Sequence, residues 1–258
     1  IIATLHHSIH DPNLKKYKGW LRAVYHQYWI APNERYIMQE VQQVTAVSQF
    51  VADMAKRTLC DVSIQVIYNG VNTELFIPSN KIRQKNEPFR LLFIGSWMAR
   101  KGVDLLAPIM RELGDDFELH YTGGNAAKKD KMNMPKNMHD IGRLNQQEVI
   151  QAMQNADALL FPSRSEGFGL VVIEAMACGL PIIAIENTVI SELITHKKNG
   201  FLCEQDNVYH ISHYIRKLSS NQIIYTQMAN FGVTTSSKFT NKIMIENYFK
   251  LYQKYLNC

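Results

Sequence analysis

The residues best suited to chemistry lie in a short loop that reads Ser163-Arg164-Ser165-Glu166-Gly167-Phe168-Gly169-Leu170. Gly167 and Gly169 let the backbone approach a ligand closely and turn several N–H groups the same way. A helix is expected to begin at Leu170, and its first turn adds the positive end of the helix dipole. The loop therefore predicts a binding site for a phosphorylated molecule.

Two glutamates accompany this loop and lie eight positions apart. Glu166 is in the loop itself, and Glu174 is one turn inside the expected helix. Carboxylates at such places accept hydrogen bonds from ribose or sugar hydroxyls. A pair of glutamates at this spacing is common in helices without any function, so the pair alone decides nothing. The pattern Pro162-Ser163-x-x-Glu166-Gly167-Phe168-Gly169-Leu170, followed by Cys178-Gly179-Leu180-Pro181, is far more specific.

Alternating strands and helices must position this loop. Expected strands lie at residues 89–95, 117–122, 139–142, 158–162 and 181–185, and expected helices at 103–113, 146–155 and 170–178. Such alternation is typical of an α/β fold with a parallel sheet covered on both faces. Ligands of these sheets sit beyond the carboxyl ends of the strands. The loops after Gly95, Thr122, Ile141 and Phe161 are therefore the ones that should hold a ligand.

The flanking segments continue the alternation. Strands are expected at residues 1–5, 44–47 and 64–68, a helix at 15–36, and a second helix at 49–58 with Ser48 as its cap. Residues from 208 onward should be helical, the last helix running over 241–256, and 78–88 should be a surface loop. A strand that begins at residue 1 with no turn before it predicts that sequence is missing upstream.

Composition excludes several classes. The chain has 258 residues, a net charge of +5 and 46% hydrophobic residues, and this mild basic excess is too weak to predict nucleic-acid binding. Its four cysteines, Cys60, Cys178, Cys203 and Cys258, match neither a zinc site nor a redox pair, which favours reduced thiols in the cytosol. No stretch is long and apolar enough to cross a bilayer.

At this point the sequence resembles the family-four retaining glycosyltransferases, also called glycosyl transferases group 1. The signature of that family is a Glu, seven residues and a second Glu, carried here by Glu166 to Ala184 as EGFGLVVIEAMACGLPIIA. Further matches are Ser48-x-Phe50, Tyr68-Asn69-Gly70-Val71-Asn72 with Phe76, Phe93-Ile94-Gly95 through Lys101-Gly102, Glu192, and Asn199-Gly200-Phe201.

The resemblance implies a GT-B fold made of two Rossmann-like domains. Residues 1–62 would be a truncated N-terminal, acceptor-side domain and 63–238 the domain that binds the nucleotide sugar. Residues 239–258 would be a C-terminal helix that packs back on the first domain. The resemblance carries no cofactor with it.

The resemblance also implies roles for particular residues. Glu166 would bind hydroxyls of the transferred sugar and Glu174 the ribose. The backbone of Phe168, Gly169, Leu170 and Val171 would meet the diphosphate and sugar, and Lys101 would neutralise the departing diphosphate. Gly95 and Ser96 would form the phosphate loop, and Ile141-Gly142-Arg143 would border the base. His6 would be the acceptor-side histidine near the reacting sugar, although His7 and His10 are close enough to compete for that place.

The sequence departs from the family pattern in two places. Ser96 stands where the family often has an Arg, and Arg100 is the candidate to supply the missing charge. The Gly-rich loop near the family's N-terminus has no counterpart, so about the first third of such an enzyme is expected to be absent.

The predicted reaction is transfer of a hexose-like sugar from a nucleoside diphosphate to a hydroxyl of a saccharide or glycolipid acceptor, with retention of configuration. The chain contains no Asp-x-Asp, so a metal-independent scheme is expected, in which Lys101, Arg100 and the helix N-terminus balance the leaving charge. Polysaccharide synthesis in the cytoplasm, with a peripheral contact to the inner face of the membrane, is the expected setting. The sequence contains neither the glycine motif of a nucleotide-cofactor dehydrogenase nor that of a P-loop enzyme, which argues against both classes. A non-catalytic module that binds a nucleotide sugar remains an alternative.

Overall fold

The computed structural model describes residues 1–7, 10–17, 19–79, 87–186 and 188–256. Most of the loop expected at 78–88, and Cys258, fall outside the described residues. In the described part the strands form two parallel sheets, one of six strands and one of three. The predicted α/β class is therefore confirmed.

The larger sheet has the strand order β6-β5-β4-β7-β8-β9, with every pair parallel. Its strands are β4 (Phe89–Phe93), β5 (Phe117–Tyr121), β6 (Met138–Asp140), β7 (Ala158–Phe161), β8 (Ile182–Ile185) and β9 (Gly200–Cys203). Chain order runs outward in one direction from β4 and in the other from β7. The switch point of the sheet therefore lies between β4 and β7, and sheets of this topology bind ligands at that point.

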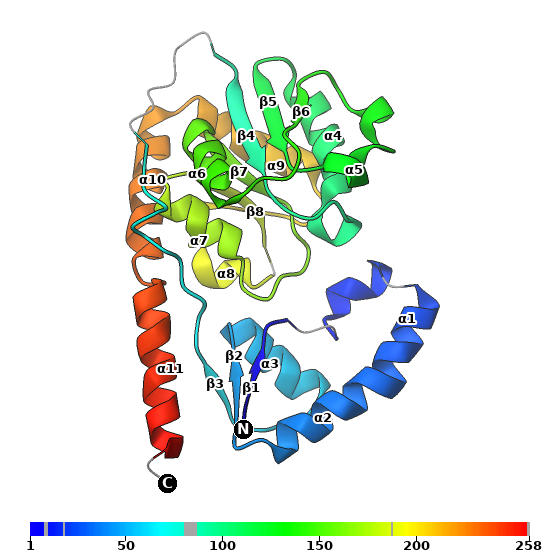
Figure 1. Ribbon diagram of the computed structural model, residues 1–258. Helices are drawn as coiled ribbons and strands as arrows, with labels where there is room; N and C mark the ends of the chain where they lie inside the picture. Colours follow the sequence, from blue (N-terminus) through cyan, green and yellow to red (C-terminus); the bar gives the residue numbers. More distant parts are fainter. Residues whose placement is uncertain (8–9, 18, 80–86, 187, 257–258) are drawn as a thin grey trace.

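Helices cover both faces of this sheet (Figure 1). They are α4 (Val103–Leu113), α5 (Gly124–Ala127), α6 (Gln146–Asn155), α7 (Leu170–Ala177), α8 (Ile190–Leu193), α9 (Val208–Ser219) and α10 (Gln222–Ser236). Alternate residues of a strand face opposite sides, so Leu91 and Phe93 pack with α4 and α9, whereas Leu92 packs with α6 and α7. The short 3₁₀ helices η3 (Ala99–Lys101) and η4 (Lys131–Asn133) lie in the loops after β4 and β5.

The smaller sheet consists of β1 (Ile2–Leu5), β2 (Gln43–Ala46) and β3 (Ile64–Val66), with β2 in the centre. Ser48 caps α3 (Gln49–Thr58) as predicted, because its side chain accepts a hydrogen bond from the N–H of Val51. A single helix over 15–36 was the wrong expectation. The structure has η1 (Pro12–Tyr17), then α1 (Trp20–Tyr25), the π-helical η2 (His26–Ile30) and α2 (Ala31–Glu40). Pro32 explains the π turn, because its ring disturbs the regular bond pattern of the preceding turn.

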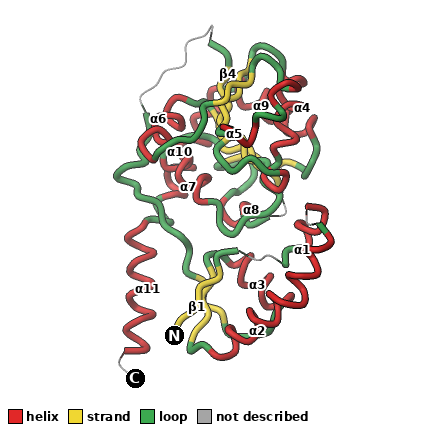
Figure 2. Tube along the Cα trace, turned by 45° about the vertical axis from the view of Figure 1, so that its right-hand side comes forward, coloured by secondary structure: helices red, strands yellow, loops and turns green. Residues whose placement is uncertain are grey.

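The two parts are joined along one side of the molecule. Val71, just after β3, forms a parallel bridge with Thr240, directly before α11 (Asn241–Leu256). Helix α11 runs beside the three-stranded part (Figures 1 and 2), and the Tyr255 hydroxyl donates to the Gln43 side chain at 2.9 Å. None of the helices in the described ranges is long and apolar enough to span a membrane.

Candidate active site

The loops after β4 and β7 meet at the switch point of the larger sheet. The N–H of Arg164 donates to the carbonyl of Arg100 at 2.9 Å, which holds the two loops together. Gly102 makes this approach possible, because a Cβ at its position would lie 2.2 Å from the carbonyl oxygen of Pro162, and its φ is +73°. The sequence thus brings Lys101 and the 163–169 loop to one place.

Lys101 and Glu166, both predicted from the sequence, form an ion pair here. Their side chains are only 15% and 11% exposed. The Ser163 hydroxyl donates to the same oxygen, Oε1, of Glu166 at 2.6 Å, and the Lys101 ammonium also lies 5.8 Å from the centre of the Phe161 ring. One cation and one anion are therefore held side by side in a largely desolvated corner, where each acts strongly on an incoming charge.

Two arginines at this corner, Arg100 and Arg164, differ in their hydrogen-bond partners. Arg100 donates to the carbonyl of Ser165 at 3.2 Å and stays half-buried beside Lys101. Arg164 is almost fully buried and is held by both oxygens of Asp104 and by Asp206, each at 2.7 Å, and its pKa is raised chiefly by the bond to Asp104. Arg164 therefore anchors the loop, whereas Arg100 is half-buried next to Lys101 and bonds to the backbone of this loop.

The start of α7 presents backbone rather than side chains. Gly169 has φ +93°, and the Phe168 ring is buried 5.9 Å from Tyr68 and 5.8 Å from Phe239. Leu170 is exposed and Val171 is half-buried. Because the first N–H groups of a helix have no partner within the helix, this turn can bind an anion through its backbone. The backbone role expected for Phe168, Gly169, Leu170 and Val171 stays a prediction.

Glu174 lies one turn further into α7 and is half-buried. Burial raises the pKa of its carboxyl group. Within the described ranges, no hydrogen-bond donor or cation satisfies this carboxylate. A partly desolvated carboxylate without a partner costs stability, and a ligand hydroxyl would remove part of that cost.

A cavity of about 520 Å³ opens beyond the ends of β4, β5 and β6. Its walls include Gly95, Ser96 and Arg143, all predicted from the sequence, and Trp97, which was not. The Thr122 hydroxyl ties the loops together, accepting from the Gly95 N–H at 3.0 Å. A space of this size is typical of small-molecule sites.

Asp140 holds together two loops that line this cavity. Its carboxylate accepts hydrogen bonds from the N–H groups of Gly123, Gly124 and Gly142, at 3.0–3.1 Å, and pairs with Lys131 at 2.8 Å. Burial raises the pKa of Asp140, but the bonds from Lys131 and the three N–H groups outweigh it and bring the pKa down to about 2. One ionised side chain thus fixes the loops after both β5 and β6.

The two histidines at the end of β1 make different contacts with the Glu166 loop. The side chain of His6 is exposed, and its carbonyl oxygen lies so close to Gly167 that a Cβ there would be 1.8 Å away. His7 is half-buried instead, with Nε2 at 3.3 Å from the Ser165 hydroxyl. Burial and the nearby charge of Arg100 lower the pKa of His7, although Glu166 and Asp11 oppose the shift. The imidazole of His7 therefore contacts the Glu166 loop directly.

The part of the molecule that contains the smaller sheet also contacts the 163–169 loop. The Ser48 hydroxyl donates to the carbonyl of Gly167 at 2.7 Å, and Ser165 donates to Asp11 at 2.7 Å. Glu192 accepts hydrogen bonds from the N–H groups of Gln49 and Phe50, so it caps α3 from the other part of the molecule.

The sequence alone did not single out four residues of this region: Ser163, Ser165, Trp97 and Asp140. Serines and aspartates are frequent in loops, so their residue type is no signal of function. The two serines could have been found only as members of the specific 162–170 run.

Comparison with known proteins places this geometry in a family. A family model described as glycosyl transferases group 1 matches residues 77–234, and one described as glycosyltransferase family 4 matches residues 1–75. An uncharacterised glycosyltransferase of Methanocaldococcus jannaschii is 29% identical over 223 residues, which are 85% of this chain and 62% of the relative. The chain thus spans 62% of the length of that relative.

Solved structures are similar over nearly the whole chain. Sucrose-phosphate synthase from Thermosynechococcus elongatus gives a TM-score of 0.86 at 20% identity, covering 99% of this chain and 68% of that one. HepE of Anabaena, solved in complex with UDP-glucose, gives 0.81 at 19% identity over 98% and 72% of the two chains. At these identities the likeness concerns the fold, and the predicted GT-B architecture is confirmed.

Proposed function

Because the chain belongs to the glycosyl transferases group 1 family, we propose that it forms the donor-binding part of a retaining glycosyltransferase. The whole enzyme would move a sugar from a nucleoside diphosphate to a hydroxyl of an acceptor. We propose that residues 63–238 bind the donor, that 1–62 belong to the acceptor-side domain, and that 239–258 brace the two.

The observation that carries this proposal is the Lys101–Glu166 pair at the β4/β7 switch point, directly beside the start of α7. A nucleoside-diphosphate sugar has an anion next to a ring of hydroxyls, and the pair offers a cation next to an anion. In our proposal Lys101 turns from Glu166 to the diphosphate, and Glu166 accepts hydrogen bonds from the sugar. Glu174 accepts from the ribose, and the base enters the cavity bordered by Gly95, Ser96 and Arg143.

The bond between the anomeric carbon and the diphosphate oxygen would break as the acceptor oxygen bonds to the same face of that carbon. The acceptor proton would pass to the departing diphosphate. Lys101, Arg100 and the N–H groups at the start of α7 would stabilise the negative charge as it develops on the leaving group. These groups support a scheme that needs no metal ion. His6 and His7 both reach this region from the end of β1, and we propose the neutral imidazole of His7 as the one beside the reacting sugar.

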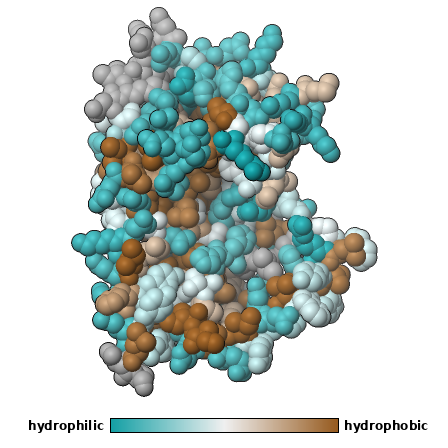
Figure 3. Space-filling view, in the orientation of Figure 1, coloured by the Kyte–Doolittle hydropathy of each residue, from teal (hydrophilic) through white to brown (hydrophobic). Residues whose placement is uncertain are grey.

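We further propose a saccharide or glycolipid acceptor, reached at the inner face of a membrane. Exposed aromatic residues on α1, η2 and α2 support this, with Trp20 74%, Tyr28 72% and Trp29 63% exposed, and with Lys16 and Arg22 also exposed nearby. Figure 3 shows apolar side chains exposed on the lower part of the molecule. Aromatic and basic side chains together favour the interface of an anionic membrane.

The alternative is a module that binds a nucleotide sugar without transferring it. This alternative stays open because the chain spans only 62% of the length of the relative from Methanocaldococcus jannaschii. The two differ in turnover. A panel of UDP- and GDP-sugars would be incubated, in the presence of a chelator, with this chain and with the longer protein that contains it, and release of nucleoside diphosphate would be measured. We expect release by the longer protein, its loss in the Lys101→Ala variant, and a product whose anomeric configuration by NMR matches the donor. Binding without release in both proteins would favour the module, and an inverted product would contradict the mechanism.

A further inference from the structure

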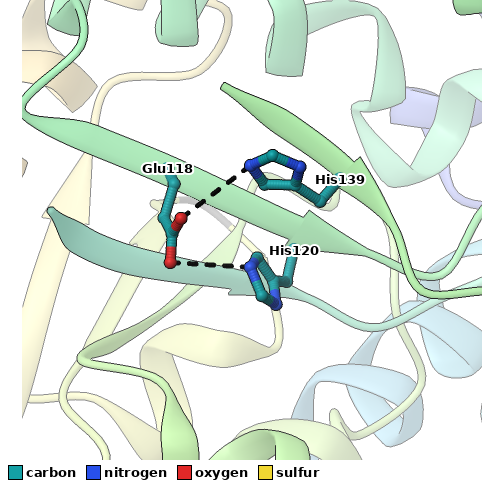
Figure 4. A group of neighbouring side chains, drawn as sticks. All are labelled: Glu118, His120 and His139. Carbon is teal, nitrogen blue, oxygen red and sulfur yellow. Dashed lines mark ion pairs between the residues drawn. The ribbon is translucent and has the colours of Figure 1, made fainter. Parts of the chain in front are cut away.

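A second group of polar side chains lies on β5 and β6, near one edge of the larger sheet (Figure 4). Glu118 and His120 are two positions apart on β5 and so share one face of the sheet. His139 on β6 is the register partner of His120, which places it on that face too. The pairing of the strands therefore gathers two imidazoles and one carboxylate from residues distant in sequence.

The geometry of this group is close to that of a metal site. The Nε2 atom of His120 is 3.5 Å from Oε1 of Glu118, and Nε2 of His139 is 3.8 Å from Oε2. The three potential ligand atoms all lie within 4.8 Å of one another. Ligand atoms around a tetrahedral zinc ion are roughly 3.3 Å apart, given bonds of about 2.0–2.1 Å. The three atoms would therefore have to approach one another by at most about 1.5 Å.

We propose that Glu118, His120 and His139 bind a divalent transition-metal ion such as Zn²⁺. Imidazole and carboxylate ligands suit zinc, cobalt and nickel better than magnesium or calcium. Three protein ligands leave a position for water, as in many open zinc sites. His139 is exposed and the other two are half-buried, so an ion can enter from solvent.

Arg90 gives this group an outer support. It is the register partner of Glu118 on β4, and its guanidinium donates to Oε1 of that carboxylate. Outer partners of this kind orient a metal-binding carboxylate, and here they leave Oε2 directed at His139. The positive charge of Arg90 opposes a cation, so we expect affinity in the micromolar range rather than tighter.

The site would act on the sheet and not on the transfer reaction. It shares no residue with the Lys101–Glu166 corner, and an ion bound there would tie β6 to β5. Metal binding at this site therefore does not depend on the proposed function.

Calorimetric titration of ZnCl₂ into the chelator-free protein at about pH 7.5, where free histidine is neutral, tests the proposal. We expect one ion per chain and a rise in Tm of about 5–10 °C at saturation. His120→Ala and His139→Ala should each weaken binding at least about tenfold, whereas His213→Ala, which removes an exposed histidine of α9, should bind as the wild type does. Lowering the pH should weaken binding because protons compete for the imidazoles.

A second measurement guards against binding by cysteines and against loss of folding. The absorption spectrum of the Co²⁺-loaded protein should lack a band from thiolate ligation. His139→Ala removes an exposed side chain, so circular dichroism should show that it folds as the wild type. Wild-type affinity in both histidine variants, a thiolate band, or no zinc binding at all would each overturn the proposal.

Discussion

At the scale of the residue, Lys101 and Glu166 neutralise each other in the absence of a donor. Each charge is thereby compensated in a corner where an unpaired charge would be expensive. An incoming donor can replace both partners at once, since it supplies a diphosphate for Lys101 and hydroxyls for Glu166. Arg164 is barred from the same role, because Asp104 and Asp206 already occupy its guanidinium.

Replacing Lys101 by alanine should weaken binding of a nucleoside diphosphate by on the order of 1.5–3 kcal/mol, or roughly ten- to a hundred-fold. Calorimetry with UDP and GDP measures the change. Lys250→Ala on the exposed side of α11 is the matched control and should bind as the wild type does. An unchanged affinity in the Lys101 variant would remove Lys101 from the site and leave Arg100 as the cation.

His7 should make stability depend on pH in a defined direction. Burial and Arg100 lower its pKa below the usual 6.5, so just below pH 6.5 the unfolded chain binds more protons than the folded one. Stability should then fall as the pH drops from about 6.5. His7→Gln should lose less stability than the wild type between about pH 7 and pH 5.5, measured by urea unfolding. His213→Gln should follow the wild-type curve, and an identical curve for His7→Gln would show that this imidazole does not resist protonation.

At the scale of the element, Asp140 joins two loops that different strands deliver. Asp140→Asn removes the charge that Lys131 and three N–H groups stabilise, and should cost about 1–3 kcal/mol of unfolding free energy at neutral pH. It should also weaken binding of a nucleoside diphosphate, because the loops after β5 and β6 line the cavity. Asp115→Asn, in the exposed turn before β5, is the control for both measurements. A variant as stable as the control would mean that these loops hold their shape without Asp140.

The strands of the larger sheet and the helices that cover it were predictable from the sequence. Their apolar residues form clear patterns, and capping residues, glycines and prolines mark their ends. The short strand β9 (Gly200–Cys203) was missed because it begins with glycine, a residue that strands disfavour. The π turn before Pro32 was missed because such a turn has no sequence pattern of its own. In the site, Glu166 and Lys101 were found through their motif, whereas the partners of Asp140 depend on strand pairing across the sheet. No local pattern contains that information.

At the scale of the whole molecule, Glu192 links the two parts by accepting the first N–H groups of α3, while Ser48 caps the same helix and contacts Gly167. Glu192→Ala should therefore cost about 0.5–2 kcal/mol, as loss of a helix cap does. Urea unfolding measures it, with Glu246→Ala on exposed α11 as the control. An unchanged midpoint would show that solvent caps α3 equally well.

We propose that one donor lies across the switch point, with its sugar at Glu166 and its ribose at Glu174. Calorimetric titration of Glu166→Gln and Glu174→Gln tests this most directly, in a chelating buffer, with the nucleoside diphosphate that binds the wild type more tightly and with its glucose conjugate. Glu166→Gln should bind the free diphosphate at least as well as the wild type does, because no carboxylate then competes for Lys101, and should bind the conjugate about 1–3 kcal/mol more weakly. Glu174→Gln should weaken both ligands, because both contain the ribose. If Glu174→Gln altered neither affinity, or if Glu166→Gln weakened both ligands equally, the donor would not lie as described.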